Sequence, residues 1–175
     1  MVQLLMRRPH LLDLPTPPAL PEGYEVRLLA GGADAPSLVE TLRGAFGEQW
    51  TEETARELLI EADDVLAVYV ATYDGSTVAT ASSRWVPDLY PGSGYVHWVG
   101  THPDHVRLGL GTAVVGRVLQ DFRDRGYRDA VLQTEDFRIP AMRSYLKLGF
   151  VPELDVEGED HRDRWRTIFQ TRIGL

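Results

Sequence analysis

The segment from His105 to Thr112 holds the residues of this chain best suited to chemistry. It reads His-Val-Arg-Leu-Gly-Leu-Gly-Thr and joins an apolar, strand-like run to a strongly helical one. Gly109 and Gly111 carry no side chain, so a ligand can approach the main chain closely there. The first N–H groups of a helix have no partner within the helix and attract anions. The spacing predicts a pyrophosphate-binding loop, although this motif alone fits a tight strand-to-helix turn equally well.

Two common nucleotide-binding patterns do not match the loop. The Gly-Lys-Ser/Thr ending of a Walker loop is missing. The third glycine of the dinucleotide pattern is also missing, because Thr112-Ala-Val114 follows Gly111, and no acidic residue ends a strand about twenty positions later. Binding of a different nucleotide stays open as a weaker alternative.

The composition disfavours a metal site and a covalent acyl-enzyme. The chain has no cysteine, which excludes thiolate metal sites, disulfides and a cysteine nucleophile. His102, Asp104 and His105 lie too close together in one loop to close a tetrahedral shell, and we interpret them as turn residues. No Ser–His pair is evident from the sequence. We therefore expect no metal.

Two segments together resemble the acetyl-CoA-binding core of the GNAT superfamily of N-acetyltransferases. The first is Thr101-His-Pro-Asp104 followed by Val106-Arg-Leu-Gly-Leu-Gly111, compared with the family pattern Gln/Arg-x-x-Gly-x-Gly/Ala after a strand and a His-Pro-Asp/Glu-like turn. The second is residues 139–150, compared with Ala-x-x-x-Tyr-x-x-x-Gly-Phe. The positions that fit it are Ala141, Tyr145, Gly149 and Phe150.

The resemblance implies acetyl-CoA as the acyl donor and assigns residues to it. The main chain of Val99, Gly100 and Thr101 would pair with the pantetheine arm, and an N–H there would polarise the thioester carbonyl. The pyrophosphate would be held by Val106, Arg107, Leu108, Gly109, Leu110, Gly111 and Thr112.

Two positions depart from the family. Val106 stands where the family has Gln or Arg, and Arg138 stands where an asparagine often contacts CoA. Arg138 is a candidate phosphate ligand, because a guanidinium suits phosphate. A solvated surface arginine is the equal alternative.

The resemblance also implies catalytic residues. Tyr145 matches the family's usual acid, and its phenol would protonate the departing thiolate; a core tyrosine is the alternative. His97 is a candidate base for the amine, because strand alternation would place it on the same face as Val99 and imidazole titrates in a useful range. A half-buried structural histidine is its alternative. Other candidates are Tyr95, Glu135, Asp136 and a water chain.

The expected function is an acyl-CoA-dependent N-acyltransferase. It would move an acetyl group to the primary amine of a small molecule or peptide by direct attack, with positioning supplying much of the rate. The alternative is a catalytically inactive CoA- or acyl-CoA-binding sensor or regulatory module, which the departures at Val106 and Arg138 keep open. The acceptor and the acyl-chain length stay undetermined. Family members are often dimers, so a homodimer is possible.

Local patterns indicate the elements that would position these residues. Capping residues predict helices that begin after Asp34 and after Thr51, and Asp74-Gly75 predicts a hairpin. Glycines mark the ends of helices over 111–125 and 140–148. The expected strands cover 24–29, 65–73, 76–86, 95–101, 129–134, 150–156 and 165–171.

This order of elements predicts a three-layer α/β (α+β) fold of the acyl-CoA N-acyltransferase type. Its central sheet would be mixed, mostly antiparallel, and flanked by helices. We expect one domain over residues 23–175, with structure starting near Tyr24. Residues 1–22 are expected to form an extended arm, since prolines crowd residues 9–22.

The overall charge and hydropathy disfavour nucleic acid and membranes as partners. The chain has 175 residues, with 18 Lys+Arg against 26 Asp+Glu and a net charge of -8. A field of that sign disfavours nucleic acid. No apolar run is long enough to cross a bilayer, and the first residues have the reverse charge order of a signal peptide. We expect a cytoplasmic protein without a membrane partner.

Overall fold

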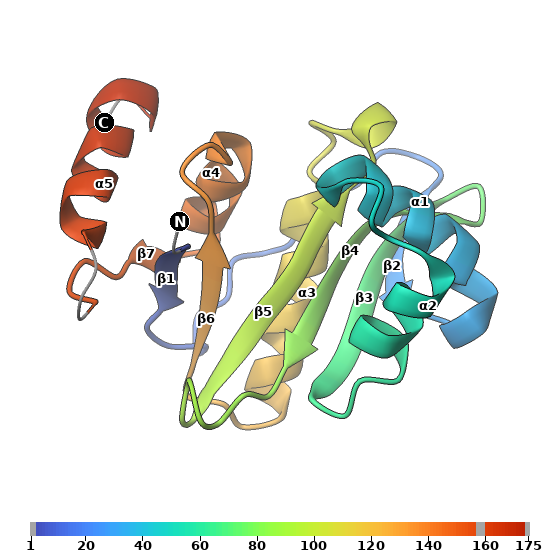
Figure 1. Cartoon of the computed structure of the whole chain (residues 1–175), viewed down its shortest axis with the longest axis horizontal. Coiled ribbons are helices and arrows are strands. Elements are labelled where there is room, and N and C mark those ends of the chain that lie inside the picture. Colours follow the sequence, from blue (N-terminus) through green and yellow to red (C-terminus); the bar gives the residue numbers. More distant parts are fainter. Residues whose placement is uncertain (1–2, 157–159, 174–175) are drawn as a thin grey trace.

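The computed structural model describes residues 3–156 and 160–173 and is built on one seven-stranded sheet (Figure 1). The strands lie in the order β2-β3-β4-β5-β6-β1-β7. Within the described residues, β5 and β6 pair in parallel and the other neighbours pair antiparallel. The strands are β1 Leu4–Arg8, β2 Tyr24–Leu28, β3 Val65–Tyr73, β4 Ser76–Arg84, β5 Ser93–Thr101, β6 Asp129–Thr134 and β7 Val151–Pro152.

Helices cover both faces of the sheet and divide the core in two (Figure 1). On one face, apolar residues of α1 and α2 pack against β3. On the other face, α3 and α4 pack against β1, β3, β4 and β6, and Trp165 and Ile168 of α5 join the same cluster. The helices are α1 Ala35–Phe46, α2 Glu52–Ala55, α3 Leu110–Asp124, α4 Ile139–Lys147 and α5 His161–Ile168. The predicted mixed, mostly antiparallel sheet flanked by helices is confirmed.

Several local predictions are also confirmed. Asp74 and Gly75 both have positive φ, as a tight hairpin turn between twisted strands requires, and they join β3 to β4. Thr51 caps α2: its hydroxyl accepts from the Thr54 N–H, while the Thr54 hydroxyl accepts from the Thr51 N–H.

Asp34 precedes α1 as predicted, but its side chain does not cap the helix. The carboxylate instead accepts two hydrogen bonds from the Arg27 guanidinium, at 2.6 and 2.8 Å, and one from the Ala30 N–H. The hydrogen bonds from Arg27 hold the pKa of Asp34 below its usual range. Asp34 thus ties β2 to the start of α1.

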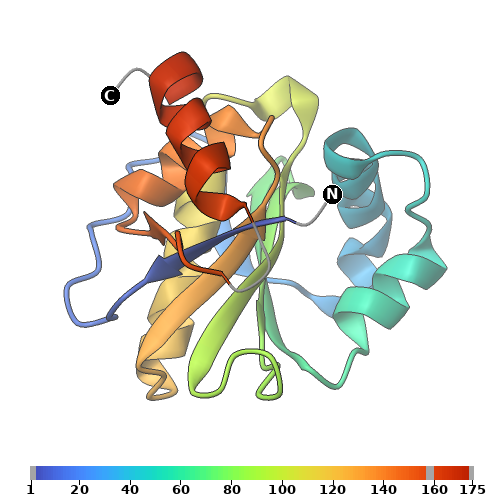
Figure 2. The ribbon, with the colours of Figure 1, turned by 60° about the vertical axis from the view of Figure 1, so that its left-hand side comes forward.

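The prediction that structure starts near Tyr24, after an extended arm over 1–22, is wrong. Residues Leu4–Arg8 form β1, which lies between β6 and β7 (Figure 2). Leu4 and Met6 are fully buried, with less buried residues between them, so the strand alternates as a half-buried strand does. The prolines that suggested an arm begin only at Pro9, after the strand has ended.

The two predicted closing strands are largely wrong. Instead of a strand over 150–156, only Val151–Pro152 pairs, with β1. Instead of a strand over 165–171, the chain forms α5 and then a π-helical turn, Phe169–Ile173. Trp165 and Ile168 are buried three residues apart, which is helical spacing. The predicted acidic turn over 157–163 falls partly on residues 157–159, which lie outside the described residues.

Candidate functional site

A cavity opens where two parallel strands separate. β5 pairs with β6 from Ser93 to Val96, and the pairing ends at Val96 and Leu132. Beyond that point the β5 main chain has no strand partner on its β6 side among the described residues. The cavity has a volume of about 330 Å³. It is lined by Gln3, Phe46, Gln49, Tyr95, Val96, His97, Trp98, Val99, Leu132, Gln133, Thr134, Glu135, Arg138, Ala141 and Tyr145.

A bulge in β5 shapes this cavity. Thr80 pairs with Gly100 and Ser82 with His97, so β5 has one residue more than β4 in this stretch. Trp98 has a positive φ of 46° there and packs edge-on against Phe46 and Trp50. Because of the extra residue, the predicted placement of His97 and Val99 on one face does not hold. Val96 and Val99 both pack in the α3 cluster, whereas Trp98 packs against the α1 cluster and the His97 ring lies against the Trp98 ring, 4.6 Å between centres.

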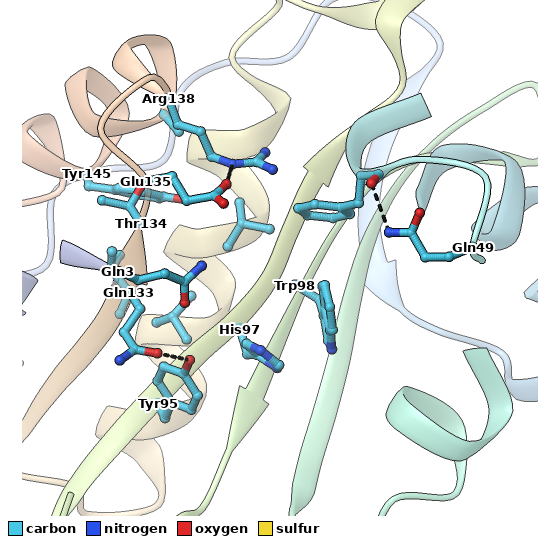
Figure 3. Close-up of a pocket in the computed structure, with 15 residues that line it drawn as sticks. Gln3, Gln49, Tyr95, His97, Trp98, Gln133, Thr134, Glu135, Arg138 and Tyr145 are labelled. Carbon is cyan, nitrogen blue, oxygen red and sulfur yellow. Dashed lines mark hydrogen bonds and ion pairs between the residues drawn. The ribbon is translucent and has the colours of Figure 1, made fainter. Parts of the chain in front are cut away.

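His97 lies in the cavity wall (Figure 3). Its Nδ1 lies 2.8 Å from Nη1 of Arg84, which in turn pairs with Asp64. A guanidinium can only donate, so Nδ1 accepts and Nε2 carries the ring proton. Burial, with a smaller effect of the Arg84 charge, lowers the pKa of His97 to about 4. His97 is therefore neutral near pH 7 and presents an N–H donor.

Tyr145 lies on α4 and contributes to the same cavity (Figure 3). Its ring packs edge-on against Phe150, and the residue is only 5% exposed. Burial raises the pKa of the Tyr145 phenol. Because its pKa is raised, the hydroxyl keeps its proton near pH 7. No hydrogen bond to it is found within the described residues, so it is available to a ligand.

The glycine loop has the geometry of a helix N-terminus that receives an anion. Gly109 lies at the N-cap of α3 with a φ of 80°, and Arg107 also has a positive φ, 66°. The first α3 hydrogen bond runs from the Ala113 N–H to the Gly109 carbonyl. The N–H groups of Leu110, Gly111 and Thr112 therefore precede the first helical bond and have no acceptor in the helix.

The start of α3 lies beside the end of β5. A Cβ on Gly111 would meet the Thr101 Oγ1 at 3.6 Å. The predicted cofactor residues thus form a continuous path, from Val99 in the cavity along β5 to the glycine loop. Glycine at position 100 also lets α1 pack closely on β5, since a Cβ there would lie 3.0 Å from both Ala45 and Phe46 of α1.

The side chains of the predicted loop divide between core and solvent. Leu110 is buried and Leu108 packs against the α3 cluster, so both anchor the loop. Val106, at the position that departs from the family pattern, is 46% exposed. Its apolar side chain offers no hydrogen bond, which leaves main-chain groups and Arg107 to meet an anion.

Arg138 faces the cavity from the N-cap of α4 rather than open solvent. Its Nε donates to Glu135 at 2.6 Å, and its guanidinium lies 5.0 Å from the centre of the Phe46 ring. The side chain thus reaches from α4 across to the end of α1 (Figure 3). Of the other candidate bases, Glu135 is held by Arg138, and Asp136 pairs with Arg164.

Sequence reasoning missed several cavity residues. Gln133 accepts a hydrogen bond from the Tyr95 hydroxyl at 3.2 Å, and Gln49 donates to the Phe46 carbonyl. Strand alternation over 129–134 could have pointed to Gln133. Gln3 was missed because its strand was not predicted, and Arg84 because nothing in the sequence links it to His97.

The described residues form neither a metal site nor a membrane span. They contain no group of three or more His, Cys, Asp or Glu side chains placed to hold a metal ion. In the same part of the chain, no helix has both the length and the apolar character that a membrane crossing needs.

Known proteins resemble this chain in sequence. The acetyltransferase (GNAT) family pattern matches residues 35–150. A mycothiol acetyltransferase from Actinosynnema mirum is 32% identical over 155 residues, which cover 85% of this chain and 51% of that protein. This chain spans about half the length of such curated relatives.

Solved structures share the fold. A GCN5-related N-acetyltransferase from Sphaerobacter thermophilus aligns with a TM-score of 0.68 at 23% identity, covering 87% of this chain and 49% of that one. AAC(6')-Iy, solved with the bisubstrate analogue CoA-S-monomethyl-acetylneamine, aligns with a TM-score of 0.64 at 15% identity, covering 76% and 93%. The family match spans more than half of the sequence and includes α3, β6 and α4, and so the chain belongs to the acetyltransferase (GNAT) family.

Proposed function

We propose that this chain transfers an acetyl group from acetyl-CoA to the primary amine of a small molecule or peptide. The single observation that carries the proposal is the edge of β5 beyond Val96, which has no strand partner on the β6 side in the described part of the chain. This edge lines a cavity that also holds Tyr145, and it leads to the unpaired N–H groups at the start of α3. An extended amide-bearing arm ending in a diphosphate fits such a path.

The residues along this path suit coenzyme A. In the proposal, the main chain of Val99, Gly100 and Thr101 pairs with the amides of the pantetheine arm. Main-chain donors of the loop from Val106 to Thr112 bind the pyrophosphate, because a helix N-terminus favours negative charge. The fold neighbour AAC(6')-Iy was solved with an analogue that contains CoA. Arg138 is a proposed phosphate ligand only if it leaves Glu135.

The reaction is a direct displacement at the thioester carbonyl. The amine nitrogen forms a bond to the carbonyl carbon, and the carbon–sulfur bond breaks. The Val99 N–H is the proposed donor to the carbonyl oxygen as negative charge develops there. Tyr145 gives its proton to the leaving sulfur; its raised pKa keeps it protonated until then. The proton that the nitrogen sheds after it has bonded to the carbonyl carbon passes to water, and Tyr145 regains a proton from water.

His97 fits an orienting role better than the role of a base. Its Nδ1 lone pair is held by Arg84, and a pKa of about 4 makes it a weak proton acceptor. Its Nε2–H is free to hydrogen bond an acceptor group in the cavity. We therefore propose that the amine loses its proton to water before attack, while His97 helps to orient the acceptor.

The acceptor is proposed from the relatives and the cavity together. One curated relative is a mycothiol acetyltransferase, and fold neighbours include acetyltransferases with an aminoglycoside or a ribosomal-protein alanine in their names. A small-molecule or peptide amine covers all of these. A homodimer and a cytoplasmic location stay predictions.

Thiol release from acetyl-CoA, measured with a broad panel of primary amines, tests the proposal. Calorimetry with CoA runs beside it. Turnover with at least one amine, together with CoA binding, would support the transferase. CoA binding without turnover for any amine would favour the inactive sensor. No CoA binding at millimolar concentration would refute both.

A further inference from the structure

The side chain of Gln3 reaches the proposed acceptor cavity from outside the segment that matches the family. The match covers residues 35–150, whereas Gln3 directly precedes β1. Leu4 pairs with Thr134 at the end of β6, which brings Gln3 to the cavity wall. Figure 3 shows Gln3 beside Gln133, with His97 and Trp98 on the other side of the cavity.

The polar groups around Gln3 are uncharged hydrogen-bonding groups. Gln133 carries an amide and Tyr95 a hydroxyl. The Gln133 amide oxygen accepts from the Tyr95 hydroxyl at 3.2 Å, and no acceptor for the Gln133 amide nitrogen is found within the described residues. This wall therefore offers a hydrogen-bond donor to a polar ligand group.

The charged side chains near this wall are paired with groups of opposite charge. Glu135 is the only carboxylate among the described cavity residues, and it pairs with Arg138 at 2.6 Å. Behind His97, Arg84 pairs with Asp64. A polycationic acceptor would lose its hydration without gaining an unpaired carboxylate. The wall instead suits an acceptor whose body carries hydroxyl or amide groups.

We propose that Gln3 determines acceptor specificity, by hydrogen bonding a hydroxyl or amide group that lies next to the reacting amine. The inference rests on the proposed acetyl transfer. A carboxamide both donates and accepts, so it matches groups that do the same. The acceptor class is therefore a monoamine with a neutral, hydroxyl- or amide-bearing body.

The side chain of Gln3 is available to a ligand, because the residues that follow it anchor β1 without its help. Its side chain makes no hydrogen bond in the described part of the chain and is exposed. Leu4 and Met6 bury their side chains under α3 and α4, and Arg7 donates to Asp129 at 3.0 Å and to Glu153 at 2.5 Å. Substitution of Gln3 should therefore leave β1 in place.

Steady-state kinetics of Gln3→Ala tests the role with two amines, glucosamine and its hydroxyl-free counterpart cyclohexylamine. We expect the KM for glucosamine to rise about fivefold or more, as for a lost hydrogen bond. The KM for acetyl-CoA and for cyclohexylamine should stay within about twofold, since neither meets Gln3. Gln170→Ala, an exposed glutamine on the C-terminal helical turn, is the matched control.

Adding a negative charge at position 3 should shift the preference towards acceptors with a second positive charge. Gln3→Glu keeps the shape but adds an unpaired carboxylate. It should raise kcat/KM for a diamine such as putrescine relative to a monoamine by about threefold or more, with the gain reduced by salt. An unchanged ratio would count against contact between Gln3 and the acceptor.

A labelling experiment separates this inference from the proposed function. The chain has no cysteine, so Gln3→Cys introduces a single thiol. Its alkylation by iodoacetamide is followed by mass spectrometry with the thiol-free analogue desulfo-CoA, with and without each amine of the panel. Gln170→Cys again serves as the control. Amines that are turned over should protect Cys at position 3 but not at position 170.

Each combination of results has a consequence. Turnover with protection supports both proposals. Turnover without protection overturns the role of Gln3 and leaves the transferase standing. Protection without turnover overturns the transferase and leaves Gln3 in a binding site for amines. Neither result overturns both.

Discussion

Tyr145 has the properties of a proton donor. It is buried in the wall of the cavity, its pKa is raised, and its hydroxyl keeps its proton near pH 7. Tyr145→Phe should lower kcat by about tenfold or more, with little change in the KM for acetyl-CoA, because only the proton transfer is lost. Rapid-mixing or steady-state thiol release measures this.

The matched control for that prediction is Tyr95→Phe. Tyr95 lines the same cavity and also has a raised pKa, about 12, but its hydroxyl already donates to Gln133. Its loss should change kcat by less than about threefold. Equal effects of the two substitutions would remove the special role of Tyr145.

His97 makes the stability of the fold depend on pH. Its pKa is about 4 in the folded protein, against the ordinary histidine value of 6.5 that applies to the unfolded chain. The unfolded state therefore binds a proton first as pH falls, so folding stability is full above pH 6.5 and is lost as pH drops towards 4. The loss is at most about 3 kcal/mol.

Urea unfolding between pH 7 and 4 measures this effect. The His97→Gln variant should lose less stability over that range than the parent chain, because glutamine does not titrate. Carboxylates titrate in both proteins and cancel in the difference. A pH dependence that is the same in both would contradict the lowered pKa.

The N-terminal strand contacts the C-terminal end of α4, the helix that carries Tyr145. Arg8 of β1 is 5% exposed, and its Nη1 donates to the Leu148 carbonyl at the C-terminus of α4, at 2.8 Å. A cation favours the negative end of a helix dipole. At Gly149, a Cβ would lie 1.8 Å from that nitrogen. Arg8 and Gly149 thus fit each other closely.

Comparison of two glycine substitutions tests this contact. Gly149→Ala and Gly126→Ala both place alanine at a positive φ, 83° and 82°, which costs about 1–2 kcal/mol in each case. Only Gly149→Ala also displaces Arg8, since nothing lies within 4 Å of a Cβ at Gly126. Gly149→Ala should therefore lose at least about 1 kcal/mol more in urea unfolding. Equal losses would mean that Arg8 moves away without cost.

The elements that the sequence predicts well are those with local chemical signals. Thr51 caps its helix, Asp74-Gly75 makes its turn, and Gly126 ends α3, because each depends on its near neighbours in the chain. The N-terminal strand lacks such a signal. Its pairing partner in β6 lies more than a hundred residues away, and the prolines that follow it suggest an arm instead.

The candidate site divides in the same way. The glycine loop and Tyr145 lie in contiguous motifs, so the family resemblance reaches them. The bulge at Trp98 is set by packing against Phe46 and Trp50, which no pattern within β5 reveals. The bond between Arg84 and His97 crosses between two strands, and its effect on the His97 pKa follows only from burial.

The N-terminal strand β1 joins the C-terminal elements to the rest of the sheet. β7 pairs with β1 and with no other strand in the described residues, and β1 in turn pairs with β6. Arg7 adds a second link, since it donates both to Asp129 of β6 and to Glu153 just after β7. The strand also brings Gln3 to the cavity and Arg8 to α4. One short strand therefore connects the C-terminal elements, the acid-bearing helix and the acceptor wall.

Leu4→Ala tests whether β1 holds the C-terminal elements in place. Leu4 is fully buried, so its truncation should lower the free energy of unfolding by about 2–4 kcal/mol. Leu119→Ala, at an equally buried position on α3, should cost a similar amount and serves as the control. In native-state hydrogen exchange, Leu4→Ala should increase the exchange of β7 and α5 amides relative to those of β3 and β4, because β1 is the only strand that holds β7 among the described residues. Leu119→Ala should not change that ratio, and a ratio unchanged in both variants would show that the C-terminal elements are held by α4 rather than by β1.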